Sequence, residues 1–183
     1  MAVVVIVGVL SVVGVALFRA KIFGAKSVEA VEMVQNIRAA QESYRATHQR
    51  YLNVSGSNLS DNDSIAPLGW WPAGSTPPAV PVAFLPPPTG AINWTNLEGH
   101  WRALAPDASK LVRYQYACVA GPDPINPLTD TPPAVAGNPA WPTPNGALWY
   151  VIEARGDLDG DGVLSYVVGS SFSPEIYVQN EGE

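Results

Sequence analysis

The chain has 183 residues, the size of a single domain, and its 16 glycines and 18 prolines stay below the share typical of disordered chains. Ten Lys and Arg against sixteen Asp and Glu give a net charge of −6, the wrong sign for a protein that binds a phosphate backbone. No nucleic-acid partner is therefore expected. The single cysteine, Cys118, excludes a disulfide within the chain and a cysteine-based zinc site.

Proline and charge divide the chain into regions. Seventeen of the 18 prolines lie between residues 67 and 144, where they exclude a long helix. Residues 153–183 contain seven of the 16 acidic residues and one of the ten basic ones, so residues 1–152 carry nine of each and are neutral. We predict four segments: an apolar helix half (1–18), an amphipathic helix half (19–50), a loop region rich in Pro, Ser and Trp (51–110), and an antiparallel sheet (111–183) with a Pro-rich loop and an acidic turn.

The first 18 residues are uncharged, and twelve of them are Val, Ile, Leu or Phe. This composition is typical of a membrane segment or a signal sequence. A cleaved signal is disfavoured because no basic residue precedes Arg19 and no clean small-residue cleavage site follows. As a helix the segment would rise about 27 Å, slightly less than the roughly 30 Å of a bilayer core. We therefore expect apolar sequence upstream of Met1.

The next segment, residues 19–50, has no proline and one glycine, and it is rich in strong helix formers. It continues the apolar segment, so the pattern predicts one helix from near Ala2 to near Gln49. An ordinary membrane anchor with a helical stalk would show the same pattern. Apolar and aromatic residues recur at helical spacing and are expected to cover a sheet: Val28, Val31, Val34, Ile37, Ala40 and Tyr44.

These residues resemble the N-terminal helix of type IV pilins and type II secretion pseudopilins. Met1–Phe18 is similar to the apolar stretch that follows the family's conserved glutamate, with matches at Val3, Val4, Gly8 and Ser11. The segment NIRAAQESYRATHQRYL, residues 36–52, resembles the end of the family's helix. The resemblance covers the first third of the chain.

The resemblance implies a subunit that is anchored in the bacterial inner membrane by a single pass and then polymerises into a filament. Its partners would be copies of itself, the assembly machinery and a prepilin peptidase, and its location would be an extracellular pilus, or the periplasm for a pseudopilus. A helix that is apolar all round can be buried in lipid or among copies of itself. The residues expected in the filament core are Val3, Val4, Ile6, Gly8, Val9, Leu10, Val13, Gly14, Leu17 and Phe18.

The chain also departs from the family pattern. The family's N-methylated aromatic residue and its glutamate would lie upstream of Met1, and Ala16 stands where the family has a helix-bending proline. A single cysteine cannot form the C-terminal disulfide of many pilins, although a cation-bound loop, as in pseudopilins, could replace it. Arg19, Lys21 and Lys26 flank the wrong side of the apolar segment for an N-in orientation, which a basic leader upstream would correct.

The C-terminal third shows the pattern of a sheet. Leu111–Ala120 alternates, with Val112, Tyr114, Tyr116 and Cys118 on one face. Further strands are predicted at 148–154 and 163–168, and an edge strand at 176–178. We expect an α+β fold in which the long helix packs on a three- to four-stranded antiparallel sheet, as in a pilin-like roll. The six tryptophans are expected to anchor the core and the loops.

An acidic turn joins the second and third of these strands. Asp157, Asp159 and Asp161 stand at alternate positions and Gly162 follows, as in the first half of a calcium-binding loop. Val163 would offer a backbone carbonyl and Ser165 a hydroxyl. Position twelve is Val168 where an EF-hand needs Glu, so the loop is not a full EF-hand. A metal-free Asp-Gly hairpin is the alternative, but three close carboxylates repel one another without a cation. We predict bound Ca²⁺.

The function expected is that of a structural subunit, a pilin, in a type IV pilus or related filament. A type II secretion pseudopilin is the first alternative, and a single-pass periplasmic adhesion or binding module that never polymerises is the second. His48 and His100 are the only histidines, and no known catalytic motif accompanies them, so no enzymatic activity is expected.

Overall fold

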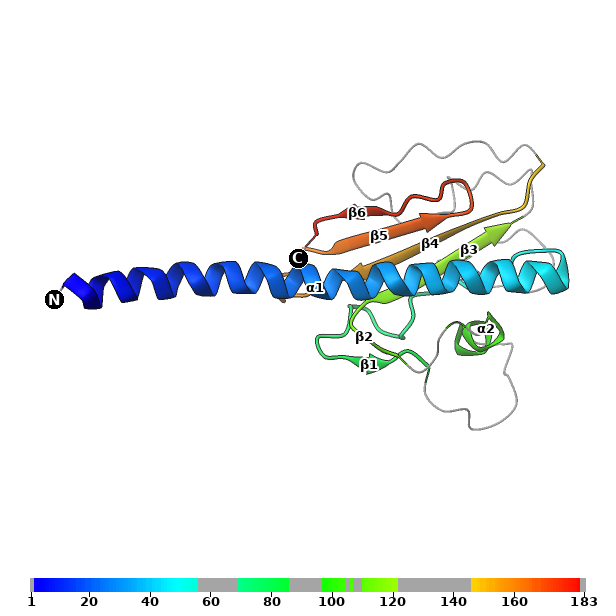
Figure 1. Cartoon of the computed structure of the whole chain (residues 1–183). Coiled ribbons are helices and arrows are strands. Elements are labelled where there is room, and N and C mark those ends of the chain that lie inside the picture. The colour runs from blue at the N-terminus through cyan, green and yellow to red at the C-terminus, as the bar shows by residue number, and fades with distance from the viewer. Residues whose placement is uncertain are drawn as a thin grey trace.

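A computed structural model describes residues 2–55, 69–85, 97–104, 106, 110–121 and 146–181, and within residues 2–25 it describes the side chains of residues 7, 8, 10 and 11 only. One long helix lies along a twisted sheet, and smaller elements lie beside both (Figure 1). In chain order the elements are α1 (Ala2–His48), β1 (Val82–Ala83), α2 (Leu97–Leu104), β2 (Leu111–Val112), β3 (Gln115–Gly121), β4 (Trp149–Gly156), β5 (Ser165–Ser170) and β6 (Tyr177–Gln179).

The bounds of α1 agree with the single helix predicted from near residue 2 to near residue 49. The helix ends where Gln49 adopts a left-handed φ of 57°. The predicted buried stripe is only partly right, because Val34 and Ile37 are fully buried whereas Val28 is 60% exposed. From Val28 to Ala40 that stripe advances three residues at a time, but a helix has 3.6 residues per turn, so such a line drifts around the axis. The buried face follows Ala30, Met33, Val34, Ile37 and Gln41.

The main sheet is antiparallel, with the strand order β3-β4-β5-β6. It confirms the strands predicted at 148–154, 163–168 and 176–178, with ends shifted by one or two residues. One face meets α1 through Tyr116, Cys118, Ile152 and Val167, which join the helix residues in one core. The other face carries a smaller apolar cluster of Val119, Trp149, Val151 and Val168.

The strand predicted at 111–120 is divided between two sheets. Leu111 and Val112 form β2, which pairs with β1, whereas β3 begins at Gln115 and pairs with β4. The break lies at Arg113, whose backbone N–H donates to Glu29 Oε1 on α1 at 2.6 Å instead of to a strand. The predicted apolar face is confirmed, because Val112 and Tyr114 are fully buried in the same core as Tyr116 and Cys118.

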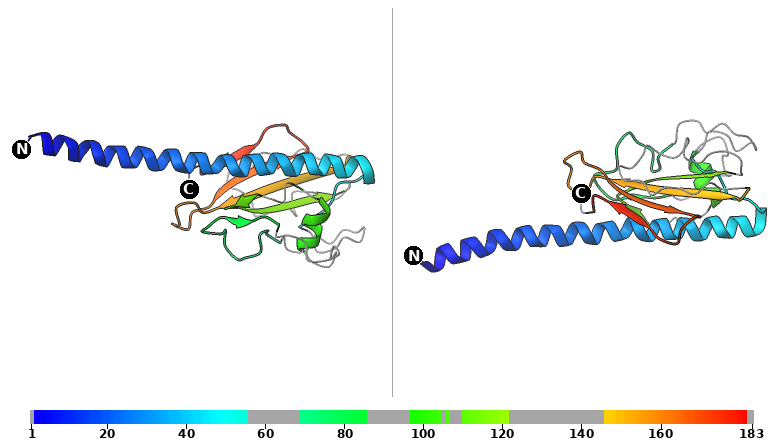
Figure 2. Two further views of the ribbon diagram at one scale, coloured as in Figure 1. Left: turned by 60° about the horizontal axis from the view of Figure 1, so that its bottom comes forward. Right: turned by 90° about the horizontal axis from the view of Figure 1, so that it is seen from above.

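The predicted fold, a pilin-like roll of one long helix on one three- to four-stranded sheet, is wrong. The described residues form two helices and two sheets with six strands. The added elements α2 and β1 lie in the region predicted to be loops. They form because Trp101 and Leu104 of α2, together with Phe84 after β1, are buried in the core that α1 and β3 share. Figure 2 shows α2 beside the sheet near the C-terminal end of α1.

Candidate functional site

The N-terminal part of α1 extends away from the rest of the molecule in every view (Figures 1 and 2). Two large apolar side chains described there are exposed, Val7 at 56% and Leu10 at 65%. A Cβ built on Gly8 would meet nothing within 4 Å. Among the predicted filament-core residues, only Gly8 and Leu10 have described surroundings. The others have a described backbone within α1, but their side chains lie outside the described part: Val3, Val4, Ile6, Val9, Val13, Gly14, Leu17 and Phe18.

A membrane-spanning helix was predicted for residues 1–18. Within the described part of the chain, no helix is both long and apolar enough to cross a membrane.

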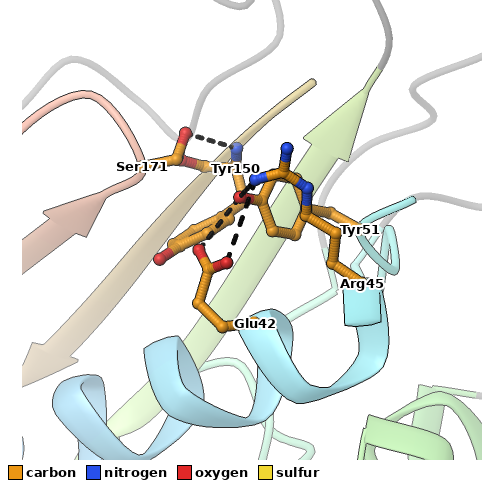
Figure 3. A network of polar contacts seen from close by, with 5 residues as sticks. All are labelled: Glu42, Arg45, Tyr51, Tyr150 and Ser171. Atoms are coloured by element: carbon orange, nitrogen blue, oxygen red, sulfur yellow. Dashed lines mark hydrogen bonds and ion pairs between the residues drawn. The ribbon is translucent and has the colours of Figure 1, made fainter. Parts of the chain in front are cut away.

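The opposite end of α1 is fastened to the sheet by a polar network (Figure 3). Tyr51, just after the helix, donates through its hydroxyl to Glu42 Oε1 at 2.9 Å and accepts from Arg45 Nη1 at 2.8 Å. Its ring meets that of Tyr150 on β4 edge to face, with centroids 4.7 Å apart. Ser171 Oγ accepts from the backbone N–H of Tyr150 at 3.0 Å. We call residues 26–181 the head. These contacts fix the direction in which α1 extends from the head.

Gln41 ties the same end of α1 to the chain that follows it. Its Oε1 accepts from the backbone N–H of Leu52 at 2.9 Å, and its Nε2 donates to Leu52 O at 2.7 Å. Nε2 also lies 3.0 Å from Cys118 Sγ. Burial raises the pKa of the Cys118 thiol to about 12, so the cysteine packs as a small neutral residue. The sequence showed no signal for the role of Gln41.

The acidic turn connects β4 to β5, and it brings the three predicted carboxylates together. Each of Asp157, Asp159 and Asp161 offers an oxygen atom, and these atoms lie within 4.8 Å of one another. The same carboxylates accept backbone N–H groups of the turn: Gly160 N to Asp157 Oδ1 at 2.7 Å, Asp161 N to Asp159 Oδ1 at 3.1 Å, Gly162 N to Asp157 Oδ2 at 3.2 Å, and Val163 N to Asp161 Oδ1 at 2.7 Å.

The two other predicted ligands differ in position. Val163 belongs to the turn and is 45% exposed. Ser165 is the first residue of β5 and is 1% exposed. Its Oγ donates to the hydroxyl of Tyr114 at 3.0 Å, which places the side chain in the core. The geometry brings the three aspartates together and leaves the Ser165 hydroxyl engaged elsewhere.

The donor set of the turn suits a hard cation. Three carboxylates supply oxygen ligands, which Ca²⁺ and Mg²⁺ both prefer, and the left-handed φ of Gly160 (81°) and Gly162 (90°) bends the backbone tightly between them. Lys26 of α1 reaches the turn from the side, with Nζ 3.4 Å from Leu158 O. The fit covers three of the six to eight oxygen atoms that Ca²⁺ takes, so carbonyl groups or water would complete the shell.

His100 lies in α2 and not in the loop that the sequence indicated. The residue is 6% exposed, and its Nδ1 lies 2.9 Å from Val54 O, so it contributes to the packing of α2. The sequence does contain a pattern that indicates α2. Leu97, Trp101 and Leu104 share one face of a helix, and Glu98 stands four residues before Arg102. The two form an ion pair at 2.6 Å.

No protein-family model matches the chain, and neither a curated protein nor a solved structure is significantly similar to it.

Proposed function

We propose that the chain is a structural subunit of a type IV pilus or a related filament, a pilin that polymerises through the first half of α1. The observation that carries the proposal is the unbroken α1, Ala2–His48, which leaves the head with exposed apolar side chains at Val7 and Leu10. In sequence, residues 1–18 carry no charge, and twelve of them are Val, Ile, Leu or Phe. Such a helix requires an apolar environment, which copies of itself supply in a filament core.

The way in which α1 is held in the head supports this proposal. If the first half of α1 packs in a filament core and the head lies on the outside of the filament, the helix must keep a fixed orientation relative to the head. The network of Glu42, Arg45, Tyr51 and Tyr150 fastens its far end, and Glu29 fastens its near end through Arg113. Before assembly the same half would lie in the bacterial inner membrane, and after assembly the head would form the outside of an extracellular filament. No catalytic step is part of the proposal.

Electron microscopy of the purified full chain tests the proposal. Filaments are expected from the unmodified chain, and Leu10→Asp should abolish them because a carboxylate would be buried without a partner in the core. The matched control is Val80→Asp, which places the same charge on an exposed apolar position of the head, at 66% exposure. Filaments should persist in this control. Filaments of normal length from Leu10→Asp would refute polymerisation through this surface.

A type II secretion pseudopilin is the second candidate, and the acidic turn favours it. In this form of the proposal Asp157, Asp159 and Asp161 hold Ca²⁺ and tie β4 to β5 where the chain has no disulfide. The cation would offset the mutual repulsion of the three carboxylates.

Thermal unfolding of the full chain in EDTA and in millimolar Ca²⁺ tests the cation. Calcium should raise the midpoint temperature of unfolding. The free energy of unfolding should rise by an amount on the order of 2.7 kcal/mol when the calcium concentration is a hundred times the dissociation constant. Magnesium should do less, because it requires stricter octahedral geometry. Asp159→Ala should remove the effect, whereas Glu175→Ala, at an exposed acid outside the turn, should retain it. Equal midpoints in both buffers for the unmodified chain would leave the turn a metal-free hairpin.

A further inference from the structure

The sheet face that lies away from α1 contains a buried acid. Glu153 stands in the middle of β4, between Ala117 on β3 and Val168 on β5, and shares its face with Trp149 and Val151. It is 3% exposed, and its Oε1 has no hydrogen-bond partner among the described residues. A carboxylate in such a place is costly unless it is paired or neutral.

Arg155, the basic residue on that face nearest to Glu153 in sequence, bonds to other groups. Arg155 donates through Nε and Nη2 to Gln115 Oε1, at 2.9 and 2.8 Å, and through Nη2 to Ser75 O at 3.1 Å. Its guanidinium also lies 4.1 Å from the centroid of the Trp70 ring. These contacts draw the positive charge toward the end of the sheet, and no ion pair between Arg155 and Glu153 occurs within the described part.

The polar surroundings of Glu153 are otherwise poor. The indole Nε1 of Trp149 and the Oε1 of Gln179 are also buried on this sheet without a partner among the described residues. The titratable groups that the strands present there are Arg155 on β4, Tyr166 on β5 and Tyr177 on β6, and β3 contributes none. Among the described groups on this face, only Arg155 is a cation that could stabilise a negative charge on Glu153.

We propose that Glu153 is a pH-sensitive element of the head: its carboxyl is buried as the neutral acid, and its ionisation opens the sheet face that lies away from α1. Burial raises the pKa of Glu153 to about 8, and the charge of Arg155 only partly opposes this rise. Between the ordinary pKa of a carboxyl and about 8, the unfolded chain has lost this proton and the folded chain retains it. The stability contributed by the bound proton is therefore complete in acid and is lost as the pH rises toward 8.

The test is unfolding of the full chain at a series of values from about pH 5 to about pH 9, for the unmodified chain, Glu153→Gln and the exposed control Glu175→Gln. In the unmodified chain and in the control, the folding equilibrium constant should fall by up to about tenfold per pH unit through the window, whereas Glu153→Gln should lose this slope. Hydrogen exchange, corrected for the intrinsic rate at each pH, should show lost protection of β4 and β5 above about pH 8 only where Glu153 is present. Parallel profiles for the unmodified chain and Glu153→Gln would overturn the proposal.

A second measurement tests the proposal without the Glu153→Gln variant, because it uses the unmodified chain. The carboxyl-carbon chemical shift of Glu153, followed by NMR in the full chain, should titrate near the top of the same window. A midpoint in the ordinary range of a glutamate, below about 6, would overturn the proposal whatever the variants do.

Discussion

Arg38 shows how a single residue holds α1 against the sheet. Its Nη1 donates to Pro174 O at 2.9 Å, and its Nη2 donates to Ser173 O at 2.7 Å and to Ser170 O at 3.1 Å. All three acceptors are backbone carbonyls at the end of β5 and in the segment that leads to β6. A guanidinium presents several donors in a fixed plane, so one side chain can bind carbonyls that follow each other in a bend.

We predict that Arg38→Met destabilises the head by about 1.5–3 kcal/mol, because hydrogen bonds from a charged donor are lost while the apolar stem is kept. Denaturant unfolding measures the change. The control is Lys110→Met, which removes the surface ion pair with Glu32 and should cost less than about 1 kcal/mol. Equal losses for the two variants would show that the contacts of Arg38 contribute no more than an ordinary surface pair.

At the scale of elements, α1 approaches β5 unusually closely. A Cβ built on Gly169 would lie 2.7 Å from Val34 Cγ1, a distance at which something must move. Val34 itself is fully buried, and so is Val167, which stands two residues before Gly169 on β5. The absence of a side chain at Gly169 therefore allows α1 to pack closely on β5. This short distance between helix and sheet brings the core side chains of the two elements, such as Val34 and Val167, into close packing.

Gly169→Ala should cost about 1–3 kcal/mol, because the added methyl group overpacks the helix against the strand. Val34→Ala removes the opposing methyl groups and should partly rescue it, so the double variant should be less destabilised than the sum of the two single ones. A double-mutant cycle by denaturant unfolding measures this coupling. Additive losses would mean that the strain is relieved elsewhere.

Elements that follow local rules could be predicted from the sequence, and those that depend on distant contacts could not. The apolar residues 1–18 and the proline-free, helix-forming residues 19–50 predicted the bounds of α1, and alternation predicted the core face of β3 with Tyr116 and Cys118. The three aspartates were expected together because alternate positions in a tight turn are neighbours. The break at Arg113 depends on Glu29, which is 84 residues away in sequence, so no local pattern shows it. Ser165 was predicted as a ligand, and its hydroxyl donates to Tyr114. Because Tyr114 comes from another element, no pattern within the turn shows this contact.

At the scale of the whole molecule, α1 belongs to two environments. Residues 26–48 are part of the head, where Met33, Val34 and Ile37 are fully buried. The half before them extends beyond the head (Figure 1), and its two described large apolar side chains, Val7 and Leu10, are exposed. In the proposed function the first half serves assembly and the second half serves the fold, so a change in one half should leave the property of the other half intact.

Two matched truncations on this one helix test the separation. Met33→Ala should destabilise the head by about 2–5 kcal/mol, because it leaves a cavity among fully buried residues. Leu10→Ala should change the stability of the head by less than about 0.5 kcal/mol, since the side chain is 65% exposed in the single chain. Unfolding should be followed under dilute, detergent-solubilised conditions that keep the chain monomeric, by tryptophan fluorescence, to which the buried Trp101 and Trp149 contribute. Filaments of Leu10→Ala should in turn dissociate more readily than those of the unmodified chain, because each copy would bury less apolar surface in the core. If Leu10→Ala lowered the stability of the monomer as much as Met33→Ala, the first half of α1 would belong to the fold of the head and would not be reserved for contacts between copies.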